Sequence, residues 1–134
     1  MILRWFVFLL LSTMIVFGAC EKEKEEHGDN EITINILKPT TGEVLTDATN
    51  VHIHIEIEAT DENHEAEIIL HPDGDVSDLI LDYDEHSHDK VIRFEQDLDL
   101  SSYPSGTTFH LEVEACVDHD CEEKERADVE FSIQ

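Results

Sequence analysis

Residues 51–59, Val-His-Ile-His-Ile-Glu-Ile-Glu-Ala, alternate strictly between apolar and polar side chains. A period of two sends successive side chains to opposite faces of an extended chain, so this segment predicts a β-strand with one buried face. Residues 109–117 show the same alternation, and five other apolar runs resemble it. Together they predict seven short strands, at residues 32–37, 51–59, 65–71, 76–82, 90–98, 108–117 and 126–133.

Polar turn residues separate these strands, and three of the connections, 39–42, 72–74 and 101–106, contain both proline and glycine. No long helical pattern competes with the strands. Residues 31–134 therefore predict an all-β domain, a seven-stranded immunoglobulin-like antiparallel β-sandwich. It would lack the inter-sheet disulfide of antibody domains. It would also lack their buried tryptophan, because the one tryptophan, Trp5, lies before the predicted domain.

The first residues are typical of an export signal. Arg4 precedes an apolar stretch, Trp5–Phe17, which is short for a membrane span and runs through two small residues into Cys20. The pattern resembles the lipobox of bacterial lipoproteins, with Phe17 where leucine is more usual. The resemblance implies a signal peptide over residues 1–19 and lipidation of Cys20. The alternative is a secretory peptide cut near the same place without a lipid.

A charged segment follows that cysteine. Residues 21–30 contain no apolar side chain to bury, so residues 20–30 are predicted to be a lipidated cysteine and a flexible acidic tether. An acidic run with lysines at this point also resembles the export signals of some bacteroidete lipoproteins. We expect a cell-envelope protein that is lipid-anchored to the outer membrane, with cell-surface exposure as one option.

The chain is strongly acidic, with 33 acidic and 8 basic residues and a formal net charge of −25. Such a charge repels nucleic acid and anionic lipid headgroups, so no nucleic-acid partner is expected. It favours cations and basic partners, and it also keeps a protein soluble. A monomer is expected, with a metal-bridged dimer left open.

Two cysteines remain besides Cys20. Cys116 and Cys121 bracket four residues of a predicted loop, and in an oxidising envelope they are expected to form a disulfide. Such a bond would close a small ring and fix the loop. The alternative is a pair of thiolates holding a soft metal, which requires a reducing environment.

Nine histidines are unusually many for this length. In an antiparallel sandwich, alternate connections between consecutive strands emerge at the same end. His64 follows the strand at 51–59, His86 and His88 precede the strand at 90–98, and His119 follows the strand at 108–117. These three connections are therefore predicted to meet at one end of the domain.

Imidazoles and neighbouring carboxylates offer nitrogen and oxygen donors to a divalent ion. The sequence predicts a metal site whose ligands are His64, His86, His88, His119 and Asp118. Zinc is the first choice, copper(II), nickel and cobalt stay open, and calcium would use only the oxygen donors. The alternative is that these are ordinary polar loop residues. A second group, expected to be solvated at the opposite end, comprises His52, His54, His71 and His110.

Residues 31–134 also resemble a family of bacteroidete lipoproteins with a histidine-containing immunoglobulin-like domain. The matching segments are Asp61–Glu65, Asp84–Lys90 and Glu114–Asp120. The family usually continues the last segment with glycine and asparagine, whereas Cys121 and Glu122 stand here, and a disulfide at Cys121 could restore the turn. The resemblance implies the fold and a metal site, but no activity.

No catalytic motif is present: there is no nucleophile elbow, no phosphate-binding glycine loop and no His-Glu-x-x-His. An enzyme is therefore not expected. The sequence favours a membrane-anchored lipoprotein that captures or buffers zinc or a similar ion, with a metal-uptake receptor or another envelope protein as partner. The alternative is a structural or adhesive domain that binds protein or glycan and has no metal role.

Overall fold

The computed structural model describes residues 29–134, which contain eight strands and no helix, and hence no helix able to cross a membrane. The predicted signal peptide, Cys20 and the tether up to residue 28 lie outside the described residues. The strands are β1 (Ile32–Lys38), β2 (Glu43–Leu45), β3 (Val51–Ala59), β4 (Glu65–Pro72), β5 (Leu81–His86), β6 (Val91–Leu98), β7 (Thr108–Cys116) and β8 (Lys124–Ile133).

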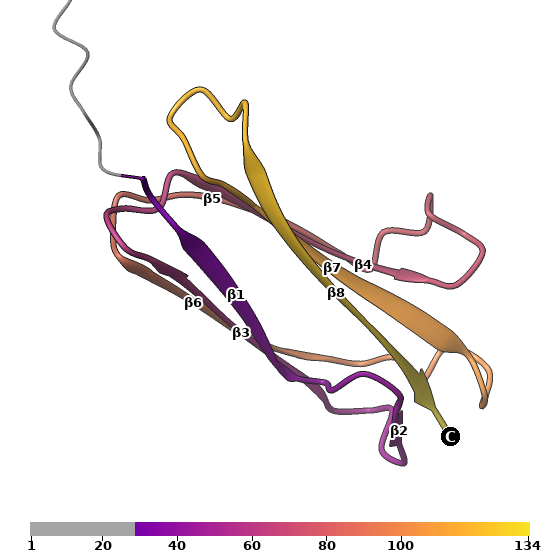
Figure 1. The fold of residues 1–134 in the computed structure, drawn as a ribbon. Coiled ribbons are helices and arrows are strands. Elements are labelled where there is room, and N and C mark those ends of the chain that lie inside the picture. The colour runs from indigo at the N-terminus through magenta and orange to yellow at the C-terminus, as the bar shows by residue number, and fades with distance from the viewer. Residues whose placement is uncertain (1–28) are drawn as a thin grey trace, which may run out of the picture.

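The strands form two sheets, so the predicted all-β sandwich is confirmed (Figure 1). One sheet has the order β1-β3-β6, and the other has the order β2-β8-β7-β4-β5. All pairs are antiparallel except β2 with β8, which is parallel. The topology is that of an immunoglobulin-like domain: β1 and β3 pair in one sheet, and the last two strands, β7 and β8, pair in the other.

Two strand predictions need correction. The structure has eight strands instead of seven, because the three residues Glu43–Leu45 form an additional strand that pairs with β8. This strand was not predicted, since three residues are too few to show an alternation of apolar and polar side chains. The strand predicted at 76–82 is instead β5, which begins at Leu81 and pairs with β4. Val76 and Leu79 lie in the β4–β5 loop and are exposed, so their apolar character does not mark a buried face.

The core comes from the alternating residues of the facing sheets. In β3 the apolar side chains from Val51 to Ile57 are at most 1% exposed, and the opposite sheet supplies similarly buried residues of β4, β7 and β8. Phe109 is fully buried, with its ring stacked on Phe131 at a centroid distance of 5.4 Å and edge-on to Tyr103 at 5.2 Å. This core holds the strands in register and therefore fixes where their loops emerge.

Three loops meet at one end of the sandwich: β3–β4 (60–64), β5–β6 (87–90) and β7–β8 (117–123). The pairing of Glu65 with His86 sets the first two side by side, and the pairing of Ala66 with Ala115 brings the third beside them. The described chain also enters the domain here, at residues 29–31 (Figure 1). The structure therefore joins the loops that the sequence assigned to one end.

Candidate metal centre

Backbone and amide hydrogen bonds hold the β3–β4 and β5–β6 loops together. The backbone N–H and the side-chain Nδ2 of Asn63 both donate to the carbonyl oxygen of Asp89, at 3.1 and 2.8 Å. The N–H of Ser87 donates to the carbonyl oxygen of His64 at 2.8 Å. Because these contacts fix the two loops relative to each other, His64 and His88 face the same space.

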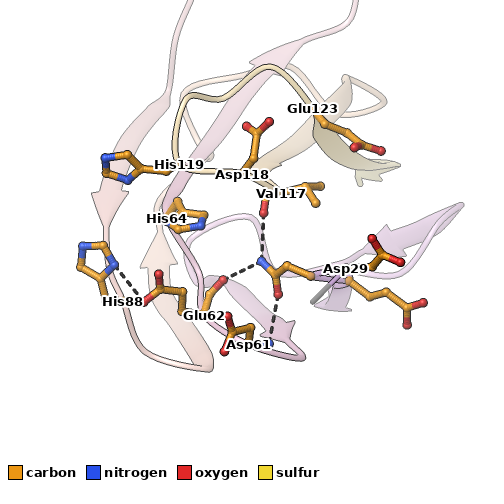
Figure 2. Close-up of a pocket in the computed structure, with 11 residues that line it drawn as sticks. Asp29, Asp61, Glu62, His64, His88, Val117, Asp118, His119 and Glu123 are labelled. Carbon is orange, nitrogen blue, oxygen red and sulfur yellow. Dashed lines mark hydrogen bonds and ion pairs between the residues drawn. The ribbon is translucent and has the colours of Figure 1, made fainter. Parts of the chain in front are cut away.

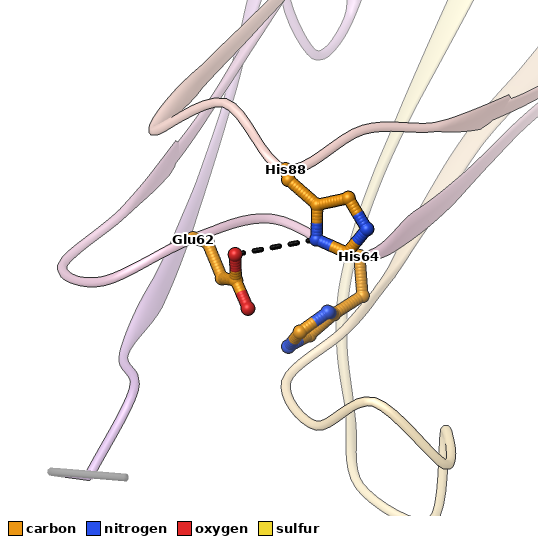
Figure 3. A group of neighbouring side chains, drawn as sticks. All are labelled: Glu62, His64 and His88. Atoms are coloured by element: carbon orange, nitrogen blue, oxygen red, sulfur yellow. Dashed lines mark hydrogen bonds and ion pairs between the residues drawn. The ribbon is translucent and has the colours of Figure 1, made fainter.

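Three side chains from these loops, Glu62, His64 and His88, bring donor atoms within 4.8 Å of one another (Figure 3). His88 Nδ1 lies 3.2 Å from Glu62 Oε2, and the rings of His64 and His88 meet edge-on at 5.9 Å. In a tetrahedral zinc site with bonds of about 2.0 Å, neighbouring donor atoms are roughly 3.3 Å apart. The spacing therefore suits a tetrahedral ion after small side-chain adjustments.

His64 has the most unusual environment of the three. The residue is only 9% exposed, and its Nδ1 is buried with no hydrogen-bond partner among the described residues. The same holds for Oδ1 of the neighbouring Asn63, which is 1% exposed. A buried polar atom without a partner costs about 1–3 kcal/mol, so an ion bound by His64 would offset a real penalty. The environment of His64 fits a metal ligand better than an ordinary loop histidine.

The β7–β8 loop contributes two further side chains. The ring of His119 meets that of His64 edge-on at 5.7 Å, so His64 lies within ring contact of both His88 and His119 (Figure 2). Asp118 lines a cavity at this end of the sandwich together with His64, His88 and His119, and its Oδ1 accepts a hydrogen bond of 2.8 Å from the backbone N–H of Glu122. His119 therefore adds an imidazole beside His64, and Asp118 shapes the loop that carries it.

His86 lies beside this group and not in it. It is the last residue of β5, it is exposed, and its register partner is Glu65. Its ring contacts that of His88 edge-on at 4.9 Å, and like His119 it is not in the group of donors within 4.8 Å. Unlike His119, however, it is not among the residues that line the cavity at the loop end. Sequence reasoning missed Glu62, although its position two residues before His64 was a signal available in the sequence.

These donors open into a cavity of about 720 Å³ at the loop end (Figure 2). Six carboxylate side chains line it: Asp29, Glu31, Asp61, Glu62, Asp118 and Glu123. Carboxylates on the walls of a cleft concentrate negative potential inside it. The cavity therefore attracts cations and repels anions.

The disulfide predicted between Cys116 and Cys121 is present, with their Cα atoms 4.9 Å apart. It closes the segment that carries Asp118 and His119, and Cys121 adopts a left-handed backbone conformation with φ of 55°. Cys121 Sγ also lies 3.7 Å from Glu65 Oε2. With the sulfurs joined, this neighbourhood supplies no thiolate ligands, and the bond constrains the loop instead.

The remaining described histidines form carboxylate pairs elsewhere. On the outer side of β3, His52 Nδ1 lies 2.7 Å from Asp97 Oδ1, and His54 Nε2 lies 3.5 Å from Glu95 Oε1. These pairs join β3 to β6, because both are register partners across the two strands. Neither pair belongs to the group at the loop end.

The expectation that His71 is solvated is wrong. His71 is only 6% exposed, because its ring stacks on that of His110, its register partner in β7, at a centroid distance of 5.5 Å. Its Nδ1–H donates to the carbonyl oxygen of Pro72 at 2.9 Å, and its Nε2 lies 3.3 Å from Glu112 Oε1. The alternation of β4 could not reveal this burial, which comes from the neighbouring strand.

We expect His71 to stabilise the fold more at low pH than at high pH. The hydrogen bond to Pro72 raises the pKa of His71, burial opposes this, and the carboxylates of Glu112 and Asp73 raise it further. A raised folded-state pKa gives stability that is fully present below the unfolded value of about 6.5 and is lost as pH rises through the folded value. In urea unfolding with chelator present, His71→Gln should therefore cost more at about pH 6 than at about pH 9. An equal or larger cost at the higher pH would contradict the assignment.

No family model and no curated protein sequence matches this chain. Among solved structures, the chain is similar to a β-glucosidase from Listeria innocua in complex with glucose, with 11% identity and a TM-score of 0.39. The match covers 77% of this chain but only 16% of that one, and a likeness this low carries no functional argument. The resemblance to bacteroidete lipoproteins stays a prediction.

Proposed function

We propose that this domain binds one divalent transition-metal ion at Glu62, His64 and His88, with His119 as the fourth ligand. The observation that carries the proposal is the meeting of three donor atoms from two loops within 4.8 Å. The buried Nδ1 of His64, which has no hydrogen-bond partner within residues 29–134, supports it independently. Zinc is the first choice because a set of imidazoles with one carboxylate matches its preferred nitrogen and oxygen donors.

The donor set also limits the other candidates. Copper(II), nickel and cobalt accept imidazole and remain alternatives, whereas calcium prefers oxygen donors throughout and would leave the three histidines unused. Four protein ligands would close the coordination sphere, as in structural zinc sites, and leave no open position for a reacting water. We therefore propose binding without catalysis.

The proposed role is metal capture or buffering by an envelope lipoprotein anchored through Cys20. Nine peptide steps separate Cys20 from Asp29, a span of at most about 32 Å. Since Asp29 lines the same cavity as His64 and His88, such an anchor would keep the ion close to the membrane. A metal-uptake receptor embedded in that membrane is the partner that this position favours.

A calorimetric titration tests the proposal. We expect metal-stripped protein, purified as the whole chain in detergent, to bind one equivalent of zinc tightly at pH 7.5 with excess calcium present. Because a metal binds only the deprotonated imidazole, this site should be lost by about pH 5.5. Only weak, multi-site heats at pH 7.5 would contradict the proposal and favour a structural or adhesive domain. Binding that persists at pH 5.5 would indicate carboxylate ligands.

A further inference from the structure

The sequence assigned Asn30 to the tether, but its side-chain amide makes hydrogen bonds to four residues of the domain. Its Nδ2 donates to the carbonyl oxygen of Glu62 at 2.8 Å and to that of Val117 at 2.9 Å. Its Oδ1 accepts from the backbone N–H of Asp61 at 3.0 Å and from the hydroxyl of Thr60 at 3.4 Å. A side-chain amide has two donor hydrogens and one acceptor oxygen with two lone pairs, so its capacity is fully used.

These bonds connect two of the three loops that carry the proposed ligands. Glu62 is itself a proposed ligand in the β3–β4 loop, and Val117 is two residues from His119 in the β7–β8 loop. Figure 2 draws the bonds that end on Glu62, Val117 and Asp61 as dashed lines to one side of the imidazoles. One amide group therefore links the two loops beside the proposed ligands.

The neighbouring backbone holds Asn30 in place. The N–H of Glu31 donates to the hydroxyl of Thr60 at 2.9 Å, and the N–H of Thr60 donates to the carbonyl oxygen of Glu31 at 3.0 Å. Pairing of Ile32 with Ala59 then continues the contact into β1 and β3. Asn30 is thus held from the strand side and reaches across to both loops.

We propose that Asn30 is a positioning residue for the metal site and sets its affinity by holding the β3–β4 and β7–β8 loops together. This inference rests on the proposed function. Groups that orient metal ligands through a hydrogen bond typically change metal affinity by about 10–100-fold when they are removed. Because residues 29–31 enter the domain at this point, the segment that precedes β1 and the metal site form one connected structure.

The test compares Asn30→Ala and Asn30→Asp with the wild type, each as the whole chain in detergent. The alanine variant removes all four bonds. The aspartate variant keeps the shape and the acceptor but turns a carboxylate oxygen toward two carbonyl oxygens. Both should weaken zinc binding by about tenfold or more and change the visible spectrum of the cobalt(II)-loaded protein, which reports ligand geometry. Asn35→Ala, in β1 outside the cavity, should leave both readouts unchanged.

The outcomes separate this inference from the proposed function. Zinc affinity within about twofold of wild type in both folded variants overturns the role of Asn30 and leaves the metal site standing, whereas absence of tight binding in the wild type removes the site itself. If neither variant folds, amide exchange in the wild type decides. The N–H of Asp61, which donates to Asn30, should exchange at least about tenfold more slowly with zinc bound, and an unchanged rate overturns the proposal.

Discussion

His64→Ala is expected to weaken zinc binding by at least about 100-fold, because loss of a ligand costs more than the 10–100-fold typical of the groups around it. His64 combines deep burial with an unpartnered Nδ1 and ring contacts to both His88 and His119. No neighbouring imidazole can take its central position without moving a loop. Calorimetry at pH 7.5 with the whole chain in detergent measures the effect.

Two matched histidine variants sharpen this test. His52→Ala removes an exposed imidazole of β3 that pairs with Asp97 of β6, so zinc affinity should not change. His86→Ala distinguishes the sequence prediction from the structure, because His86 lies outside the donor group that contains His88. Loss of tight binding in His88→Ala but not in His86→Ala supports the arrangement seen here. Equal losses in both would return His86 to the ligand set.

The sandwich could be predicted from the sequence because its central strands are clearly half-buried. In β3 and β7 every second residue is apolar and enters the core, so period and burial agree. The prediction fails in β5, because the strand predicted at 76–82 ends before most of the observed one. In β5 the exposed Asp82 and Asp84 alternate with Leu81 and Tyr83, which are more buried. Tyr83 packs on Phe94 at 4.7 Å, a contact between sheets that composition does not reveal.

The candidate site could likewise be predicted only in part. Antiparallel topology alone predicts that His64, His88 and His119 lie at one end, because it requires only the order of the strands. That reasoning also places Glu62 at this end, two residues before His64, but it does not select Glu62 as a ligand and it does not find Asn30. Their roles depend on hydrogen bonds between loops far apart in the sequence, and Asn30 was assigned to a tether because a polar segment offers no core contact. Hydrogen bonds between these loops therefore could not be predicted from the sequence.

Phe109→Ala is expected to lower the free energy of unfolding by about 3–5 kcal/mol, the usual cost of emptying a buried aromatic site. Phe109 is fully buried against Phe131 and Tyr103, and the surrounding strands cannot close the space without breaking their register. Small domains are stable by only about 5–15 kcal/mol, so this change removes much of the margin. Urea unfolding of metal-free protein measures it, and a loss below about 1 kcal/mol would contradict the packing described here.

The same variant tests whether the core and the metal site are independent. Phe109 pairs with Pro72 at the far end of β4 from His64, a separation of roughly 26 Å along the strand. Zinc at 100 times its dissociation constant should therefore add about 2.7 kcal/mol to the stability of wild type and Phe109→Ala alike. His64→Ala should gain almost nothing. Increments in wild type and Phe109→Ala that differ by more than about 0.5 kcal/mol would mean that the core and the loop end are coupled.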